Sequence, residues 1–325
     1  METTKKLGVK LKSGLLTELQ SDTIMGHVCW RMIEQLGEEK LNEFISLYSN
    51  NKPVFTISNG LLEKNNILFF PKPYLNNSSI EKIHTKKERV LNFLRMKDEK
   101  SREFITLEQL NLFLSGDKDT YLKSFELPDI KDLSYPKLTY DLRVSVEIDR
   151  QKLSSKESQL FSYNPLYVKD SNETSFVIFI KIIDEVKYNE YKCEEILKSV
   201  FDIGYGKKKS SGYGQFEVSE PEPFSGFNEP ENSNGFVTLG NYLPSQSDNL
   251  IDGFYEFNVK YGKLGEQLSK SENPFKQPII LFKPGSCFVT NRSKDFYGRI
   301  TNKGEISEVN NFAVQFGMPF TLNFN

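Results

Sequence analysis

A short glycine-rich stretch, Gly204–Gly214, combines residue types that suit phosphate oxygens. Its consecutive lysines supply cations and its serines supply hydroxyl donors, while glycines let backbone N–H groups approach a ligand closely. Two interleaved tyrosines can stack on unpaired bases. The pattern predicts a site for a single-stranded, phosphate-rich ligand. The residues concerned are Gly204, Tyr205, Gly206, Lys207, Lys208, Lys209, Ser210, Ser211, Gly212 and Tyr213.

The spacing in this stretch matches neither of the common nucleotide-binding loops. A P-loop requires Gly-x-x-x-x-Gly-Lys-Ser/Thr, and the dinucleotide fingerprint would need a glycine at position 209, which is Lys209. Both motifs also place glycines between a strand and a helix, whereas here an amphipathic helix precedes them and a short strand, 215–218, follows. The alternative is a solvated hairpin connection with ordinary lysines.

A second candidate is the start of a helix predicted over 21–36, which Ser21 or Asp22 would cap and Gly37 would end. Residues spaced by three and four share one helix face. Glycine inside a helix costs about 1 kcal/mol relative to alanine, so close approach of a ligand is one reason for its presence. The alternative is packing against a neighbouring element. The residues on this face are Thr23, Gly26, His27 and Trp30.

A third candidate lies near the C-terminus, where Pro284-Gly285 fits the centre of a type II turn. Lys283 and Ser286 flank the turn and are of types that bind backbone phosphate. The alternative is that the turn only connects the two strands of a hairpin.

Residues for catalysis or metal binding are scarce. His27 and His84 are the only histidines, no Ser-His-Asp or Cys-His arrangement is evident, and the three cysteines are far apart. We therefore expect no catalytic residues, no metal and no cofactor. The alternative is that His27 acts as a general base on a ribose 2′-hydroxyl.

The overall charge limits how nucleic acid would be bound. The chain of 325 residues carries 42 Lys and Arg against 44 Asp and Glu, a formal net charge of −2. Free-standing nucleic-acid binders are usually basic overall, so we expect local basic surfaces or partners that complete a channel. No apolar run reaches transmembrane length, and the cysteine usage fits a reducing cytoplasm without a membrane partner.

The order of predicted elements defines the fold class. Strands near 5–12, 54–60, 175–183 and 215–218 alternate with two helices as β-α-β-insertion-β-α-β. That order predicts an α+β, ferredoxin-like (RRM-like) domain over 1–219, with an insertion at about 71–140 that contains the basic segment Lys82–Arg102. Residues 220–325 hold short alternating segments, which predict a mostly β, degenerate ferredoxin-like domain.

These residues resemble a known family. Ser21–Trp30 is similar to the helix start of the subunit that caps the crRNA 5′ handle in type III-A CRISPR (Csm) complexes, the fourth Csm protein, in the Cas-five group of the RAMP superfamily. Phe55–Gly60, Gly204–Gly214 and Pro278–Phe288 resemble further family segments in the same order. Two departures are His27, which has no fixed family counterpart, and Tyr205, which interrupts a loop that is often richer in glycine.

The resemblance implies a non-catalytic RNA-binding subunit of an antiviral effector complex. Its implied partners are the crRNA 5′ handle, target RNA near the handle boundary, the large polymerase-like Csm subunit and the adjacent RAMP backbone subunit. The insertion would form a thumb between guide and target. Alternatives are a metal-independent endoribonuclease that processes repeat RNA with His27 or His84, the equivalent subunit of a Cmr-type (III-B) complex, or a binding module unrelated to RNA.

Overall fold

A computed structural model describes most of the chain. The described residues are 4–75, 102–125, 127, 130, 133–149, 151, 154–264, 273–302, 304–307 and 313–325. His84 and nearly all of the basic segment 82–102 therefore lie outside the described residues. Within the described ranges, none of the helices combines the length and the apolar character that a membrane span requires.

The central sheet has the predicted ferredoxin-like order. The strand equivalents run β11–β1–β10–β2, and every pairing among them is antiparallel. Between these strands the chain forms α1 after the first and α8 before the last. The fold class is therefore confirmed. The elements are β1 (Thr4–Leu11), α1 (Ser21–Leu36), β2 (Phe55–Ile57), β10 (Thr174–Ile182), α8 (Cys193–Asp202) and β11 (Phe216–Val218).

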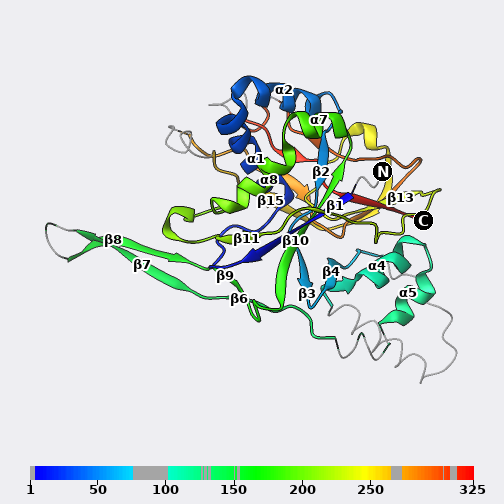
Figure 1. The fold of residues 1–325 in the computed structure, drawn as a ribbon, viewed down its shortest axis with the longest axis horizontal. Coiled ribbons are helices and arrows are strands. Elements are labelled where there is room, and N and C mark those ends of the chain that lie inside the picture. The colour runs from blue at the N-terminus through cyan, green and yellow to red at the C-terminus, as the bar shows by residue number, and fades with distance from the viewer. Residues whose placement is uncertain are drawn as a thin grey trace.

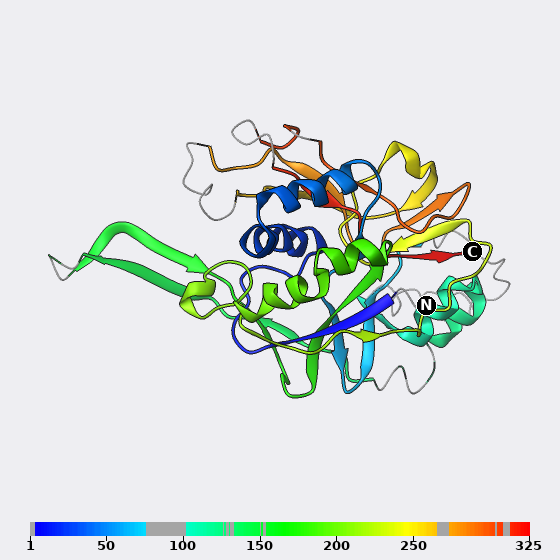
Figure 2. The same ribbon diagram turned by 45° about the horizontal axis from the view of Figure 1, so that its top comes forward.

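Additional elements widen this sheet and cover one face of it. The strands β3 (Leu61–Lys64), β4 (Ile67–Pro71) and β5 (Phe104–Thr106) continue it beyond β10, and β12 (Glu222–Pro223) pairs with β1. The helices α2 (Glu38–Ser49) and α7 (Glu185–Glu190) join α1 and α8 on one side of β1 and β10, as Figures 1 and 2 show.

Strand β10 is buried on both faces, which explains its continuous apolar sequence. Ile178 and Ile180 face the core beneath the helices, whereas Val177 and Phe179 belong to a second core on the opposite face. That second core includes Val237 and other residues of the C-terminal part. The C-terminal part thus covers the sheet face that the helices leave open.

The C-terminal part is mostly β, as predicted. A four-stranded sheet has the order β14–β17–β13–β20, and two strand pairs accompany it. Among the described residues beyond α8, the helical segments are short 3₁₀ turns. The strands are β13 (Gly235–Thr238), β14 (Leu250–Phe254), β15 (Phe257–Lys260), β16 (Ile279–Phe282), β17 (Cys287–Thr290), β18 (Arg299–Ile300), β19 (Phe316–Gly317) and β20 (Thr321–Phe324).

Among the described residues, the element that projects from the body lies outside the predicted insertion at about 71–140. In the described part of 71–140, α4 (Leu107–Leu114) and α5 (Lys118–Ser124) pack into the second core, and α4 begins at a capping box formed by Thr106 and Gln109. The projecting element is a hairpin of β7 (Arg143–Asp149) and β8 (Ser154–Tyr163), joined to the body by β6 (Leu138–Tyr140) and β9 (Leu166–Val168) (Figure 1). We call β7–β8 the arm.

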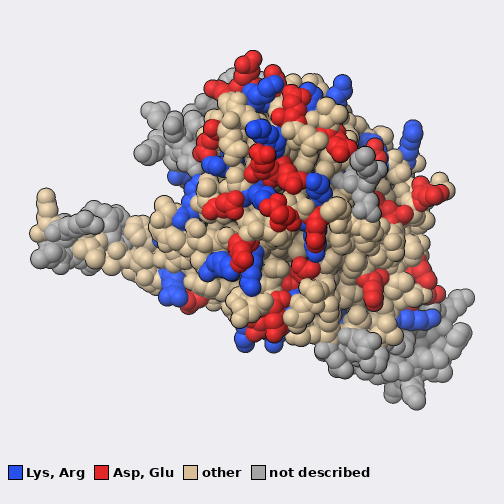
Figure 3. Space-filling model, in the orientation of Figure 1, with Lys and Arg blue, Asp and Glu red and all other residues tan. Residues whose placement is uncertain are grey.

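The arm carries an apolar face. Val144 is 57% exposed, Val146 43% and Leu160 70%, and Val146 pairs across the ladder with Leu160. The described part of the arm shows few charged side chains in Figure 3, whereas acidic and basic side chains are interspersed over the body. Because the arm contributes nothing to either core, these side chains are available for contacts with other molecules.

Candidate nucleic-acid interface

The structure brings the two glycine-containing stretches together. Helix α8 packs beside α1, and Gly204, with φ of +86°, ends the turn after α8 and redirects the chain toward α1. The rings of His27 on α1 and Tyr205 in the loop lie 4.7 Å apart between centroids. The loop therefore contacts α1 on the side that carries His27.

Most glycines in the loop are required by the packing of the loop itself. All four have positive φ, and a Cβ on Gly206 would lie 2.5 Å from Cβ of Thr17. A Cβ on Gly214 would lie 2.0 Å from the carbonyl oxygen of Tyr205. By contrast, a Cβ on Gly26 or Gly212 would meet nothing within 4 Å. Space for a ligand thus exists at Gly26 and Gly212.

The connection between β1 and α1, which we did not predict to take part, holds the loop in place through hydrogen bonds. The backbone N–H of Lys207 donates to Oγ1 of Thr17 at 3.0 Å, and that of Gln215 donates to Oγ of Ser13 at 3.0 Å. The Tyr205 hydroxyl donates to the carbonyl oxygen of Glu18 at 2.9 Å. The hydroxyl residues between β1 and α1 were the available sequence signal, but spacing alone does not show which loop they reach.

The loop presents some predicted side chains and buries one. Lys207, Lys208, Ser210 and Ser211 are exposed, while Lys209, Tyr213 and Trp30 are partly buried. Tyr205 is wrong as a base-stacking residue because it is 0% exposed and stacks on Phe201. Burial also raises the pKa of its hydroxyl well above the ordinary value.

The loop also contacts the base of the arm. Nζ of Lys208 lies 3.7 Å from the centroid of the Tyr163 ring, and the ring of Tyr213 stands edge-on to Tyr163 at 5.6 Å. Hydrogen bonds with Ser145 and Tyr213 lower the pKa of Tyr163, with Lys208 adding to the effect. The loop and the arm are therefore joined by aromatic and cationic contacts.

At the start of α1, the environments of Ser21, Asp22 and Thr23 differ from the capping and ligand-binding roles that we predicted. Neither Ser21 nor Asp22 caps the helix; Oδ1 of Asn59 accepts the hydrogen bond of the Ser21 backbone N–H at 2.8 Å. Asp22 is 3% exposed and accepts hydrogen bonds from Nδ2 of Asn241 at 2.7 Å, from Lys260 and from Gln315.

These contacts form what we call the Asp22 cluster, Asp22 with Asn241, Lys260 and Gln315. Nζ of Lys260 also lies 2.6 Å from Oγ1 of Thr23, and the backbone N–H of Asn241 donates to Oγ of Ser21 at 2.9 Å. The polar residues at the start of α1 thus fix the helix to the C-terminal part, and their side chains already have protein partners.

The C-terminal turn also proves to be structural. Gly285 has φ of +90°, as a type II turn requires, and a Cβ there would lie 2.7 Å from the carbonyl oxygen of Lys72. The Ser286 hydroxyl is buried and donates to the carbonyl oxygen of Lys283 at 2.7 Å, while Nζ of Lys283 pairs with Glu256 at 3.1 Å. The hairpin explanation holds, and the phosphate-binding prediction for Lys283, Gly285 and Ser286 is not supported by their environment.

The candidate interface shares no lining residue with either of two hollows in the protein. These hollows, of about 370 and 470 Å³, are lined by other residues, the first beside α7 and α8 and the second around Asp248 and Lys294. Within the described part of the chain, no group of His, Cys, Asp and Glu side chains is arranged to hold a metal ion. A surface of backbone donors and lysines suits an extended polyanion.

Comparisons with known proteins agree with this architecture. The RAMP superfamily model matches residues 5–217, so the chain belongs to the RAMP superfamily. That range spans the ferredoxin-like sheet, α1, α8 and the glycine-rich loop. No curated protein matches the chain by sequence.

Solved structures resemble the whole chain. One is a chain of the Csm3–Csm4 subcomplex of the type III-A CRISPR-Cas interference complex, with a TM-score of 0.63, 18% identity and coverage of 99% of each chain. Another is a chain of the Csm1–Csm4 cassette in complex with cA4, with a TM-score of 0.59, 16% identity and coverage of 99% of this chain and 98% of the other. At these identities the likeness establishes the fold.

Proposed function

We propose that the chain is the subunit of a type III-A (Csm) effector complex that holds the 5′ handle of the crRNA. The observation that carries the proposal is the meeting of the Gly204–Gly214 loop with α1, through the contact of Tyr205 with His27. Membership of the RAMP superfamily and the full-length likeness to chains of Csm assemblies support the same assignment.

The handle would be held mainly through its backbone. Lys207 and Lys208 and the hydroxyls of Ser210 and Ser211 are exposed for phosphate oxygens, and Gly212 and Gly26 leave room for the strand to approach. Trp30 and Tyr213 are the aromatic residues with exposed area at this surface, so they would stack on unpaired bases. Phosphate contacts position a strand without reading its sequence.

The proposed protein partners are the large polymerase-like subunit and the adjacent RAMP backbone subunit. Solved structures of similar fold include assemblies of Csm4 with Csm1 or with Csm3. The arm, with exposed Val144, Val146 and Leu160, offers an apolar surface for contacts within such a complex. We place the thumb function near the target boundary on the arm, because the arm projects from the body beside the glycine-rich loop (Figure 1).

The subunit would act without catalysis. His27 packs against the buried ring of Tyr205, so one of its faces is used in packing. Repeat RNA incubated with the pure protein should remain intact, and cleavage that His27→Ala abolishes would instead establish the endoribonuclease alternative.

The salt dependence of RNA binding tests the proposed role of the loop. Each lost phosphate contact on a single strand reduces the slope of log K against log salt by about 0.7. The variant Lys207→Ala/Lys208→Ala should therefore bind handle RNA more weakly, with a slope lower by about 1.4. Lys52→Ala, which removes an exposed lysine elsewhere, is the matched control. An unchanged slope in the double variant would contradict the proposal.

A further inference from the structure

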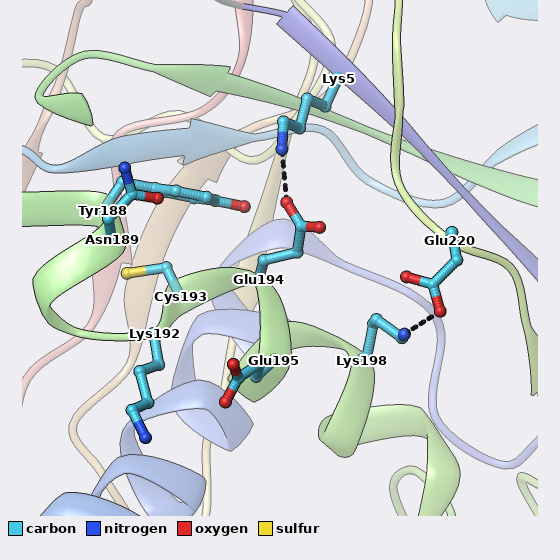
Figure 4. A pocket seen from close by; sticks show the side chains of 9 residues that line it. All are labelled: Lys5, Tyr188, Asn189, Lys192, Cys193, Glu194, Glu195, Lys198 and Glu220. Carbon is cyan, nitrogen blue, oxygen red and sulfur yellow. Dashed lines mark hydrogen bonds and ion pairs between the residues drawn. The ribbon is translucent and has the colours of Figure 1, made fainter. Parts of the chain in front are cut away.

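A polar hollow lies on the helix-covered side of the sheet, apart from the glycine-rich loop. It has a volume of about 370 Å³ and is bordered by β1, α7, the first turns of α8 and the segment before β12 (Figure 4). Its lining is made up of Lys5, Tyr188, Asn189, Lys192, Cys193, Glu194, Glu195, Lys198 and Glu220. None of these residues takes part in the proposed RNA interface.

The Tyr188 hydroxyl lacks a hydrogen-bond partner within the described structure. Tyr188 is 2% exposed, and its hydroxyl oxygen is among the buried polar atoms left unpaired. Figure 4 shows the hydroxyl directed into the hollow, toward the side chains of Lys5 and Glu194. Burial, with Glu194 adding to it, raises the pKa of this hydroxyl, so it stays protonated and can donate. A buried unpaired donor is costly unless something binds it.

The N-terminus of α8 adds further unpaired donors to the same hollow. Helix α8 has 10 residues, and no side chain caps its start at Lys192, which has φ of +50°. The backbone N–H groups of Cys193, Glu194 and Glu195 occupy the first helical turn, where no carbonyl of the helix can accept from them. Helix N-termini and their free N–H groups bind groups that carry negative charge.

The charges around the hollow restrict what can bind. Three lysines and three glutamates line it, so its formal charge is balanced. Nζ of Lys5 pairs with Glu194 at 2.5 Å, and Lys198 pairs with Glu220. Lys192 and Glu195 are both exposed, and neither has an ion-pair partner among the described residues. With no excess of positive charge in the lining, the donors and Lys192 suit at most a singly charged group, whereas a doubly charged phosphate would meet too much repulsion from the glutamates.

We propose that this hollow binds a carboxylate group. The Tyr188 hydroxyl and the free N–H groups of α8 would donate to its two oxygens, and Lys192 would neutralise its charge. The carboxylate belongs either to an acidic side chain or C-terminus of a neighbouring protein, or to a free small molecule. The proposal is independent of RNA binding because the hollow shares no residue with that interface.

Titration of the full chain with sodium acetate tests the proposal. Sodium chloride would hold the ionic strength constant, and backbone amide shifts of Cys193, Glu194 and Glu195 would report binding. We expect saturable shifts, and a loss of affinity of about tenfold or more in Tyr188→Phe, because a hydrogen bond to a charged group is removed. Lys192→Gln should weaken acetate binding as well. Shifts that do not saturate, or phosphate binding more tightly than acetate, would overturn the proposal.

The matched control is Tyr191→Phe. Tyr191 is also 2% exposed, but its hydroxyl faces Glu43 at 3.5 Å and does not line the hollow. Tyr191→Phe should bind acetate as the unmodified chain does. Tyr188→Phe should melt no lower than the unmodified chain, because the hydroxyl it removes has no protein partner; a lower melting temperature with undiminished acetate binding would show a structural hydroxyl and contradict the proposal.

A second set of experiments identifies the source of the carboxylate. If it comes from a neighbouring subunit, Tyr188→Phe weakens capture of purified large or backbone subunit and excess acetate competes with that capture. If it comes from a small molecule, succinate and similar acids bind saturably while capture is unchanged. Both results require the Tyr188 hydroxyl, and finding neither would reject the site.

Discussion

At the scale of single residues, the glycines of the loop and of α1 serve two purposes. At Gly206 and Gly214 a side chain would collide with the protein itself, whereas at Gly212 and Gly26 a side chain would project into open space. Only the second kind can leave room for a ligand. Substitutions at these positions therefore separate the folding of the loop from the binding of RNA.

Gly26→Ala should stabilise the chain and weaken RNA binding. The added methyl group meets nothing in the protein, and alanine favours the interior of α1 by about 1 kcal/mol over glycine. If the strand passes close to Gly26, the same methyl group intrudes on it and reduces affinity by roughly tenfold. Urea denaturation and equilibrium binding of handle RNA measure the two effects. Stabilisation without any loss of affinity would remove Gly26 from the interface.

Gly206→Ala should destabilise the chain more than Gly212→Ala does. Both glycines have positive φ, at +76° and +84°, so the backbone strain of a side chain is similar. Only position 206 adds a collision, with Thr17, and such overpacking typically costs about 1–3 kcal/mol. Thermal unfolding of the two variants gives the difference, and equal stabilities would show that Thr17 gives way easily.

At the scale of elements, α1 is fixed by contacts from the C-terminal part of the chain. Asp22→Asn should lower the free energy of unfolding by about 3 kcal/mol, because it leaves Lys260 without its buried partner. Lys260→Met in the same chain should recover part of that loss, since the charge that Asp22 paired with directly is then removed as well. Urea denaturation of the single and double variants tests this. A double variant no more stable than Asp22→Asn would argue against the pairing.

The limits of sequence-based prediction are visible in the same element. Periodicity predicted the bounds of α1, and Gly37 ends it as expected. Sequence spacing did not reveal that Asp22 binds residues more than two hundred positions away, such as Asn241. Tyr205 was misassigned for the same reason, because the burial of its ring depends on Phe201 and His27 packing around it.

The arm is a second element whose role the sequence left open. The alternation of Val144, Val146 and Ile148 is typical of a strand, but an alternating strand normally buries its apolar face against a core. Only the structure shows that no element of the described ranges covers this face. The fold class was more accessible to prediction, because it depends on the order of strongly patterned strands and helices rather than on particular long-range contacts.

Substitutions on the arm should affect assembly and leave folding intact. Val144→Ser together with Leu160→Ser replaces exposed apolar side chains, so stability should change by no more than about 0.5 kcal/mol per site. Assembly with crRNA and the partner subunits should weaken, because an apolar contact surface is lost. Size-exclusion chromatography of the reconstituted complex measures this. Full assembly of the variant would mean that the apolar face has another purpose.

At the scale of the whole molecule, buried thiols make stability depend on pH at the alkaline end. Burial raises the pKa of Cys193 and of Cys287. Below about pH 8 both thiols are protonated in the folded and the unfolded chain, so neither affects stability. Above about pH 8.5 the unfolded chain releases protons that the folded chain retains, which lowers the free energy of unfolding by about 1.4 kcal/mol per pH unit per thiol.

Urea denaturation at pH 7.5 and pH 9.5, with a reducing agent present, measures that loss. Cys193→Ala should be less stable at both values because it leaves a cavity, but its loss between them should be smaller. Equal stability of the unmodified chain at the two pH values would show that the thiols are not protected by burial.

The position of the RNA end on the protein is the central claim, and crosslinking tests it most directly. A complex reconstituted on crRNA with 4-thiouridine in the handle would be irradiated, digested and analysed by mass spectrometry. We predict crosslinks within 21–36 and 204–218, with Trp30 and Tyr213 among the modified residues. Handle crosslinks confined to other parts of the chain, with none in these two segments, would contradict the account.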